Sequence, residues 1–345
     1  MAPPIYEFAQ VPHVKKHAGA NTRARRPKAL GEAPRVGVIY NPRSHGNQGA
    51  DFDCGITPHV HIAQPGDRSQ LPEALNDFAE REIDLLVING GDGTVRDVLT
   101  CGAGIFGDDW PAIAVLPKGK TNALTVDLGV PRDWNLQDAI DAFGREKRVF
   151  RRPVAVTTAD KSEENCVLGF ILGAGVFTFA TKSGQSAHKL GAFNSMAVAA
   201  ATAWAILQAF LGWGENKWRQ GSRMAIRLGD QQTPMEHSGK SDPEWRQLLF
   251  TSTLEKLPAG INAFGHLEKG LKLLVLDRLS RRTLIRILSM LRGKTPENLR
   301  QHGVHQVATP QFTLIIEDQF IFDGEAFPAG SYRIGQGPEL EFVTP

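Results

Sequence analysis

The chain has 345 residues, 41% of them hydrophobic, and a formal net charge of +2 at pH 7. That length favours two domains, and the apolar share is ordinary for a globular protein with sizeable cores. The near-neutral charge gives no overall field that would attract nucleic acid, so we expect no nucleic-acid partner. Its three cysteines, Cys54, Cys101 and Cys166, form no CxxC pair. This argues against a disulfide framework or a zinc site and is typical of a reducing cytoplasm.

Residues 1–33 are predicted to be a disordered basic tail. The stretch "HVKKHAGANTRARRPKALGEAP" is polar and basic, and it lacks both apolar periodicity and the apolar core of a signal peptide. A second interpretation stays open, in which the tail is a weak electrostatic tether to an anionic membrane. Liposome binding that is unchanged after deletion of the tail would contradict the tether.

Residues 34–150 are predicted to form an α/β domain. Apolar runs bounded by turn residues predict strands, and apolar side chains at helical spacing predict helices between them. The expected strands are residues 35–42, 59–63, 83–89 and 111–117, and the expected helices are residues 69–82, a helix that opens at 94–100, and residues 121–130. Alternating strands and helices favour a parallel sheet.

Residues 151–335 are predicted to form a β-rich domain, because turn residues separate many short apolar runs. This pattern fits an antiparallel sandwich or barrel, with helical segments at residues 190–213 and 280–292. The expected strands are residues 151–159, 166–177, 222–228, 246–254, 271–277, 311–318 and 319–325. Residues 336–345 are predicted to be a terminal strand that packs back on the first domain.

The stretch "VINGGDGTVRDVL" at residues 87–99 places an aspartate among three glycines directly after an apolar run. In an open α/β sheet, ligands bind at the carboxyl ends of the strands, and Gly90–Thr94 lies at such an end. The glycines let the backbone approach a ligand closely, and the following helix offers unpaired N–H groups to an anion. Because like charges repel, Asp92 would serve a phosphate through a shared magnesium ion. A plain strand–turn–helix connection is the alternative.

Four motifs along the chain resemble, in order, those of the diacylglycerol kinase catalytic-domain family, which includes sphingosine, ceramide and bacterial lipid kinases. They are "YNPRSHG" (40–46), "GGDGTVRDV" (90–98), "LPKGKTNALTVDLGVP" (116–131) and "FDGE" (322–325). The resemblance covers most of residues 35–343. It implies a fold class of α/β plus all-β, in which a Rossmann-like nucleotide domain similar to NAD kinase and diacylglycerol kinase precedes a β-sandwich with helical insertions. The active site is then expected in the cleft between the two.

The same resemblance implies ATP and Mg²⁺ as cofactors and gives roles to the residues that match the motifs. Asp92 is expected to bind the magnesium ion. The expected nucleotide-binding residues are Asn41, Ser44, Gly90, Gly91, Asp92, Gly93, Thr94, Gly119, Lys120, Thr121 and Asn122. The expected catalytic residues are Asp323, Glu325 and Asp92.

Asp323 and Glu325 stand on either side of a glycine in "FIFDGEAF". Phosphate transfer to an alcohol needs a base, since a hydroxyl is a poor nucleophile until its proton leaves, and a carboxylate at the cleft can take that proton. By resemblance Asp323 is the base and Glu325 its supporting partner. A hairpin turn with two solvated acids is the structural alternative.

Four positions depart from the family's pattern. Lys120 stands where the family usually carries threonine or serine near the nucleotide; this leaves nucleotide affinity open, although lysine can serve phosphate as a point charge. Ala123 replaces a frequent aspartate, as in the Asn-Ala-Leu of sphingosine kinases, and Asp97 replaces a glutamate. Lys269 replaces the aspartate of a common Asp-Gly, which puts a structural metal at that turn in doubt.

Other motifs match less well. "GAGIFG" (102–107) has the spacing of a dinucleotide fingerprint, but no strand precedes it, and we expect a loop. "AVLPKGKT" (114–121) nearly matches a P-loop, but its first glycine would be Ala114, inside a strand. NAD kinases share "GGDGT" yet carry a later Pro-Thr-Gly-Ser-type segment that this sequence lacks. His59 and His61 alternate in a strand pattern, which favours an ordinary surface over a metal pair.

Two apolar segments bear on where a lipid would bind. Residues 190–213 carry no charge and are long enough to span a bilayer. A span would separate Asp92 from Asp323, so a buried or interface-facing helix, similar to the one in family members, is expected instead. In residues 280–294, Arg282, Arg286 and Lys294 stand beside a stripe of leucine and isoleucine. This fits a helix on an anionic membrane surface or a core-packed helix with solvated arginines.

These observations predict an ATP-dependent lipid kinase, cytoplasmic and peripherally associated with the inner face of the membrane. The γ-phosphate would pass to the primary hydroxyl of a membrane lipid. Diacylglycerol is the first expectation for the acceptor, and Asn-Ala-Leu leans toward ceramide or a sphingoid base. A homodimer is left open. The alternative is a catalytically weak relative that binds lipid or nucleotide as a regulator, which Lys120, Ala123 and Lys269 favour and the intact Asp92 and Asp323 motifs oppose.

Overall fold

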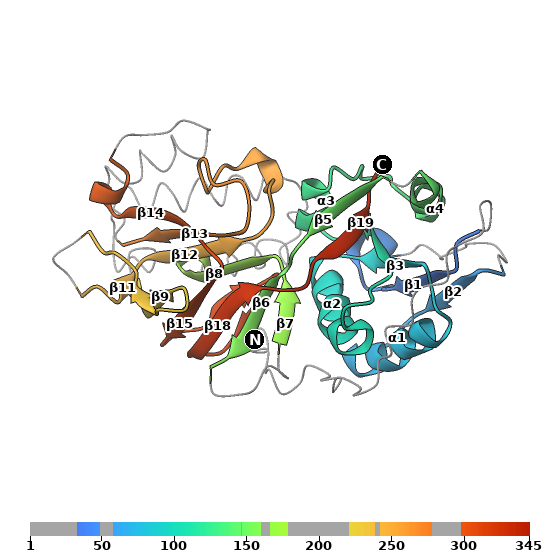
Figure 1. Cartoon of the computed structure of the whole chain (residues 1–345), viewed down its shortest axis with the longest axis horizontal. Helices are drawn as coiled ribbons and strands as arrows, with labels where there is room; N and C mark the ends of the chain where they lie inside the picture. Colours follow the sequence, from blue (N-terminus) through green and yellow to red (C-terminus); the bar gives the residue numbers. More distant parts are fainter. Residues whose placement is uncertain are drawn as a thin grey trace.

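The computed structural model describes residues 33–48, 58–145, 147–159, 166–178, 221–238, 242–277 and 298–345. Over these residues the chain forms one mainly parallel sheet flanked by helices and two antiparallel sheets (Figure 1). The predicted fold class, α/β plus all-β, is confirmed. The predicted tail up to residue 32 and the predicted helices at 190–213 and 280–292 lie outside the described residues.

The first sheet has the strand order β2-β1-β3-β4-β19-β5. Its strands are β1 (Val36–Tyr40), β2 (Val60–Ala63), β3 (Leu85–Gly90), β4 (Ala112–Pro117), β5 (Arg148–Arg151) and β19 (Leu340–Val343). β1 to β4 are parallel, and β19 pairs parallel with β4 and antiparallel with β5. β1, β3 and β4 are buried along their whole length, so they appear in the sequence as continuous apolar runs.

Helices cover both faces of this sheet (Figure 1). They are α1 (Leu71–Glu80), α2 (Asp92–Phe106), α3 (Ala123–Asp127) and α4 (Leu136–Gly144). Side chains of β3 alternate between the faces, as the pleat requires. Leu86 and Ile88 share a core with α1 and α2, whereas Leu85 and Val87 share one with α4.

The "GAGIFG" stretch, which we expected to be a loop, forms the last residues of α2, and its final glycine, Gly107, is the C-cap of that helix. The expectation was wrong because packing outweighs the low helix propensity of glycine, which costs about 1 kcal/mol relative to alanine. A Cβ on Gly102 would lie 2.5 Å from the Trp110 ring, so this position takes only glycine. Close packing therefore explains the glycine at 102, whereas Gly107 ends the helix with a φ of 57°.

The two antiparallel sheets pack as a β-sandwich. One has the order β10-β9-β15-β18-β6-β7, with β11 paired to β9, and the other has the order β14-β13-β12-β8-β16-β17. Residues from both, such as Val156 and Leu314 of the first and Leu172 and Leu249 of the second, share one buried core. The strands are β6 (Val154–Thr158), β7 (Cys166–Gly169), β8 (Ile171–Gly175), β9 (Ser222–Leu228), β10 (Thr233–Pro234), β11 (Trp245–Arg246), β12 (Leu248–Ser252), β13 (Leu271–Leu276), β14 (Val304–Thr309), β15 (Gln311–Ile316), β16 (Phe320–Phe322), β17 (Glu325–Phe327) and β18 (Gly330–Gln336).

Two stretches predicted as single strands each divide between two sheets. Residues 151–159 end β5 and then form β6, with Pro153, which has no N–H to donate, at the break. Residues 166–177 form β7 and β8, with Phe170 at the break. The second break matters for the site, because it presents the amides of Phe170 and Ile171 to the turn between β16 and β17.

Candidate active site

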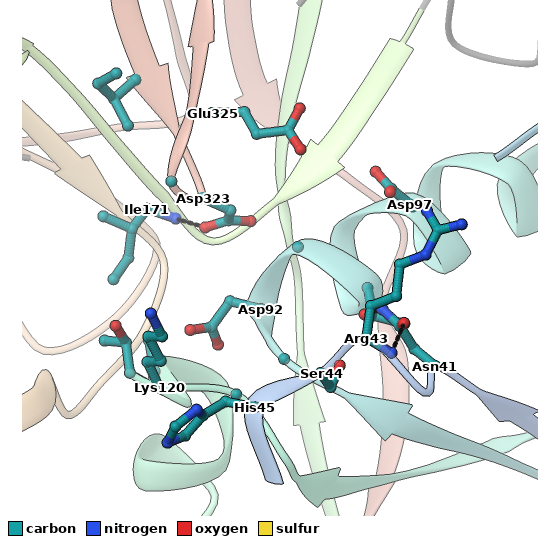
Figure 2. Close-up of a pocket in the computed structure, with 18 of the residues that line it drawn as sticks. Asn41, Arg43, Ser44, His45, Asp92, Asp97, Lys120, Ile171, Asp323 and Glu325 are labelled. Carbon is teal, nitrogen blue, oxygen red and sulfur yellow. Dashed lines mark hydrogen bonds between the residues drawn. The ribbon is translucent and has the colours of Figure 1, made fainter. Parts of the chain in front are cut away.

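A cavity of about 640 Å³ lies between the carboxyl ends of β3 and β4 and the turn that joins β16 to β17 (Figure 2). It brings together every predicted site residue except Gly90 and Asn122. The lining residues are Asn41, Arg43, Ser44, His45, Gln48, Arg68, Gly91, Asp92, Gly93, Thr94, Asp97, Gly119, Lys120, Thr121, Ala123, Ile171, Phe177, Ile321, Asp323, Gly324 and Glu325. A second cavity of about 630 Å³ shares Asn41, Arg43, Arg68, Thr94 and Asp97 with it.

The two glycine-containing loops of the first sheet touch each other at the cavity floor. A Cβ on Gly91 would lie 2.8 Å from the Cα atom of Gly119, and a Cβ on Gly119 would lie 2.6 Å from the Cα atom of Gly91. Neither position accepts a side chain unless the loops separate. The glycines therefore join the loops after β3 and β4 into one continuous backbone surface, open to a ligand.

Asp92 begins α2 and serves the neighbouring loop as well as the cavity. Backbone amides of Asn122, Ala123 and Leu124 donate hydrogen bonds to its carboxylate, so Asp92 stabilises the first turn of α3. Burial raises the pKa of Asp92, and these three amides offset part of that rise. The sequence did not indicate this structural role, which Asp92 fills while it lines the cavity.

Gly90 and Asn122 do not line the cavity, but they contact residues that do. A Cβ on Gly90 would meet the Thr94 side chain at 2.5 Å, so glycine here lets α2 begin close to β3. Asn122 has a left-handed backbone with φ of 53°, and its side chain accepts a hydrogen bond from Gly119 N (2.7 Å) and donates one to Gly119 O (2.9 Å). Both residues shape the loops that line the cavity.

The loop after β1 is tied to α2 through side-chain amides. Asn41 Nδ2 donates to Thr94 Oγ1 over 2.8 Å, and the Asn41 Oδ1 atom accepts from the amide of Arg43. Asn47 Nδ2 donates to the Asn41 carbonyl and to Asn89 Oδ1, both over 2.8 Å. This fixes the wall that carries Asn41 against the start of α2.

Asp323 lies at the turn between β16 and β17 with φ of 43°, a left-handed conformation that asparagine and aspartate tolerate better than most residues. Its two carboxyl oxygens accept hydrogen bonds from Ile171 N and Phe170 N, each over 2.9 Å. A Cβ on Gly169 would lie 2.2 Å from the Asp323 carboxyl, so glycine there makes room for the acid.

The pKa of Asp323 is raised to about 7. Burial of the carboxyl is the largest cause, and the charge of Asp92 adds to it; Arg96 and the two amides lower the pKa. A carboxyl with a pKa near neutrality is a candidate acid–base group, because it can both take and release a proton there.

Glu325 lies in a charge cluster with two arginines. Its carboxylate forms ion pairs with Arg68 and, over 3.0 Å, with Arg96 Nη2. Asp97 completes the cluster, with one oxygen 2.6 Å from Arg68 Nε and the other 2.8 Å from Arg96 Nη2. Sequence reasoning proposed Glu325 as a partner of Asp323 and did not foresee these arginines.

Arg43, His45, Arg68 and Arg96 were missed by the sequence analysis. A signal existed for Arg96: it and Asp97 are the only charged residues in α2 after Asp92, on an otherwise apolar helix. Arg43 and His45 lie within the motif "YNPRSHG" and line the cavity. Among the described residues, no group of three or more histidine, cysteine or acidic side chains is arranged to hold a metal ion.

Comparison with known proteins finds a family model that matches the first part of the chain. The model described as the diacylglycerol kinase catalytic domain matches residues 35–152. Lipid kinase YegS of Escherichia coli (strain K12) is 27% identical over 120 residues, 34% of this chain and 37% of that protein. The protein named probable lipid kinase YegS in Shigella flexneri is 26% identical over the same shares. The match thus spans little more than a third of the length of these relatives.

The likeness of fold extends further than that of sequence. A crystal structure of a diacylglycerol kinase from Bacillus anthracis str. Sterne aligns with a TM-score of 0.56 and covers 90% of this chain and 97% of that one, at 17% sequence identity. At that identity the likeness shows the fold alone, which includes the β-rich part. Residues 35–152 are therefore similar in sequence to the diacylglycerol kinase catalytic domain, and the fold of this chain is similar to that of the Bacillus anthracis protein.

Proposed function

We propose that this protein is an ATP-dependent lipid kinase that transfers the γ-phosphate of ATP to the primary hydroxyl of a membrane lipid. One observation carries the proposal: Asp323, with a pKa of about 7, faces the glycine loop that carries Asp92 across one cavity. A base opposite a phosphate-binding loop is what transfer to an alcohol needs. The family match supports the same reading.

The phosphates of ATP would bind on the side of the cavity formed by the start of α2 and the loop after β4. The N-terminus of α2, which no side chain caps, opens onto it with the Gly91–Gly119 contact beside it. Free N–H groups at a helix start attract phosphate, and Lys120 and Arg43 add positive charge at the rim. The adjoining second cavity, reached past Asn41 and Arg68, offers space for the nucleoside.

The residues that line the cavity could hold a Mg²⁺ ion only together with the phosphates of a bound nucleotide. Asp92 supplies one carboxylate, and the described residues hold no three-ligand acidic cluster around it. Magnesium in kinases is commonly held by one or two carboxylates together with phosphate oxygens and water. When bound, it would neutralise charge on the phosphates.

The Asp323 carboxylate would receive the proton of the acceptor hydroxyl. The bond from the hydroxyl oxygen to the γ-phosphorus forms as the bond from that phosphorus to the β–γ bridging oxygen breaks, and ADP leaves. The amides of Phe170 and Ile171 hold the carboxylate in place for this transfer. Lys120 and Arg43 would hold the phosphate chain as its charge shifts toward ADP.

The lipid acceptor and the membrane belong to this proposal. The relatives' names give lipid kinase and diacylglycerol kinase, and diacylglycerol is the acceptor we propose first, with ceramide or a sphingoid base next. The proposed lipid-binding part is residues 151–335, on a protein that associates peripherally with the cytoplasmic face of the membrane, alone or as a homodimer. Among the described helices, none is long and apolar enough to cross a bilayer.

The test measures phosphate transfer from labelled ATP, in the presence of Mg²⁺, to diacylglycerol, ceramide, sphingosine or undecaprenol in mixed micelles. Asp323→Asn should lower the rate of transfer by about 10²-fold or more. Asp108→Asn, at an exposed acid outside the cavity, should keep the wild-type rate. Transfer by Asp323→Asn at the wild-type rate would refute the mechanism. Transfer to no lipid, with ATP still bound, would favour the regulatory relative over the enzyme.

A further inference from the structure

Arg96 is fully buried, with 0% of its side chain exposed. Arginine is almost never buried completely unless it is paired. Its Nη1 atom donates to the carbonyl oxygens of Phe322 (3.2 Å) and Asp323 (3.4 Å). The side chain thus reaches from α2, on the first sheet, to the backbone of the turn that carries the proposed base.

That turn has an unfavourable backbone conformation that needs support. Asp323 and the following Gly324 both have positive φ, 43° and 82°. Such a conformation persists in a non-glycine residue when its surroundings hold it. The amides of Phe170 and Ile171 hold the Asp323 carboxyl from one side, and Arg96 holds the backbone carbonyls from the other.

Arg96 is itself fixed by the charge cluster. Its Nη2 atom lies 2.8 Å from Asp97 and 3.0 Å from Glu325, and Arg68 pairs with the same two carboxylates. The four side chains form a closed ring in which each charge has two opposite neighbours. Because the guanidinium is planar and makes directional contacts on several edges, this ring determines its orientation.

We propose that Arg96 is a positioning residue for Asp323: it fixes the β16–β17 turn and places a buried positive charge beside the carboxyl group. This rests on the proposed function only in naming Asp323 as a base. The positive charge of Arg96 lowers the pKa of Asp323, whereas burial and the charge of Asp92 raise it. The other charged or titratable groups that line the same cavity are Arg43, His45, Arg68, Asp92, Asp97, Lys120 and Glu325.

A first experiment tests Arg96 without any assay of activity. The Asp323 carboxyl is titrated by carbon NMR in nucleotide-free protein with labelled aspartate, and Asp323→Asn identifies its signal. In Arg96→Gln the midpoint should rise by about one pH unit, because an opposite charge close by is lost. Arg96→Lys should stay near wild type, and Arg81→Gln, which breaks an exposed pair with Asp77, should not shift it.

A second experiment separates positioning from charge. Arg96→Lys keeps the charge but loses the planar contacts to Phe322 and Asp323, so kcat should fall on the order of 10-fold or more while KM for ATP stays unchanged. A residue needed only for folding would lower the active fraction and leave the Asp323 midpoint in place. If Arg96→Gln does not fold, the kcat of Arg96→Lys decides.

Equal Asp323 midpoints in wild type and Arg96→Gln would overturn the proposal, as would an unchanged kcat in Arg96→Lys. Failure of the proposed function gives a different result. The wild-type protein would then transfer phosphate to no acceptor, while the Asp323 midpoint would still move in Arg96→Gln.

Discussion

The carboxyl groups of Asp92, at the start of α2, and Asp323, in the β16–β17 turn, face one cavity (Figure 2). The charge of Asp92 helps to raise the pKa of Asp323. Asp92 is anchored by the amides at the start of α3, and Asp323 by the amides between β7 and β8. Each acid is therefore held by backbone donors of a neighbouring segment. Their separation depends on the packing of the first sheet against the β-rich part.

The rate of phosphate transfer should depend on pH through Asp323. Its pKa of about 7 means that the carboxylate, the form that accepts a proton, is the minor form in acid. We expect kcat/KM to rise with pH and level off above about 8, and Asp323→Asn to lose about 10²-fold or more. Initial rates measured between about pH 5 and pH 9 test this. A rate independent of pH over that range would contradict the role of Asp323 as the base.

The same group should make stability depend on pH. The folded-state pKa of Asp323 lies above the value of about 3.9 in an unfolded chain, so the folded protein binds the proton more tightly. Its contribution is fully present below the unfolded pKa and is lost as pH rises through about 7.

Wild type and Asp323→Asn, compared by urea unfolding, isolate this contribution. The free energy of unfolding of wild type, relative to that of the variant, should be larger near pH 5 than near pH 8 by roughly 2 kcal/mol. Titrating groups that do not interact with Asp323 cancel in that comparison. A difference of the opposite sign would show that the carboxyl is ionised in the folded protein at low pH.

The sequence predicted the α/β part well because its strands are buried on both faces and appear as unbroken apolar runs. It predicted the β-rich part less well. Residues 166–177 appeared to be one strand, because a change of sheet at Phe170 leaves the apolar pattern intact. The glycines of "GAGIFG" suggested a loop, since nothing in the local sequence shows that Trp110 packs on Gly102.

The residues of the candidate site could also be predicted only in part from the sequence. The motifs indicated Asp92 and Asp323, since glycines next to acids are visible locally. Arg68 and Arg96 could not be assigned, because their partner Glu325 is distant in the chain and the ion pairs exist only once three segments meet. Burial also determines the pKa of Asp323, and burial there depends on the whole fold.

The contact between Gly91 and Gly119 should be essential for nucleotide binding. Gly119→Ala puts a methyl group 2.6 Å from the Gly91 Cα atom, so the two loops must separate. We expect the affinity for ATP to fall about 10-fold or more, since the backbone surface for phosphate is broken. Gly144→Ala is the control, because a Cβ there meets nothing within 4 Å. Equal ATP dissociation constants for the two variants, measured by calorimetry, would disprove the phosphate role of the loop.

Lys120 should act on ATP through its charge. It is exposed and lines the cavity. Lys120→Met should weaken ATP binding about 3- to 10-fold at low salt, and less at high salt, because screening reduces the attraction of an exposed lysine. The ATP dissociation constant of both proteins at two salt concentrations checks this. A loss that does not change with salt would indicate a steric effect in place of the charge.

Lys272 should stabilise the strand and loops beside it. Its side chain is buried, and its Nζ atom donates to the carbonyl oxygens of Leu254 (2.6 Å) and Glu268 (2.9 Å) over the ring of Phe264. Burial lowers its pKa, but removal of the ammonium leaves two carbonyls without this donor. Lys272→Met should therefore lose about 2–4 kcal/mol of unfolding free energy. Lys269→Met, at an exposed position just before β13, should change it by less than about 0.5 kcal/mol. Urea unfolding of the two variants measures the difference. Equal losses of unfolding free energy would mean that the buried ammonium group does not stabilise the fold.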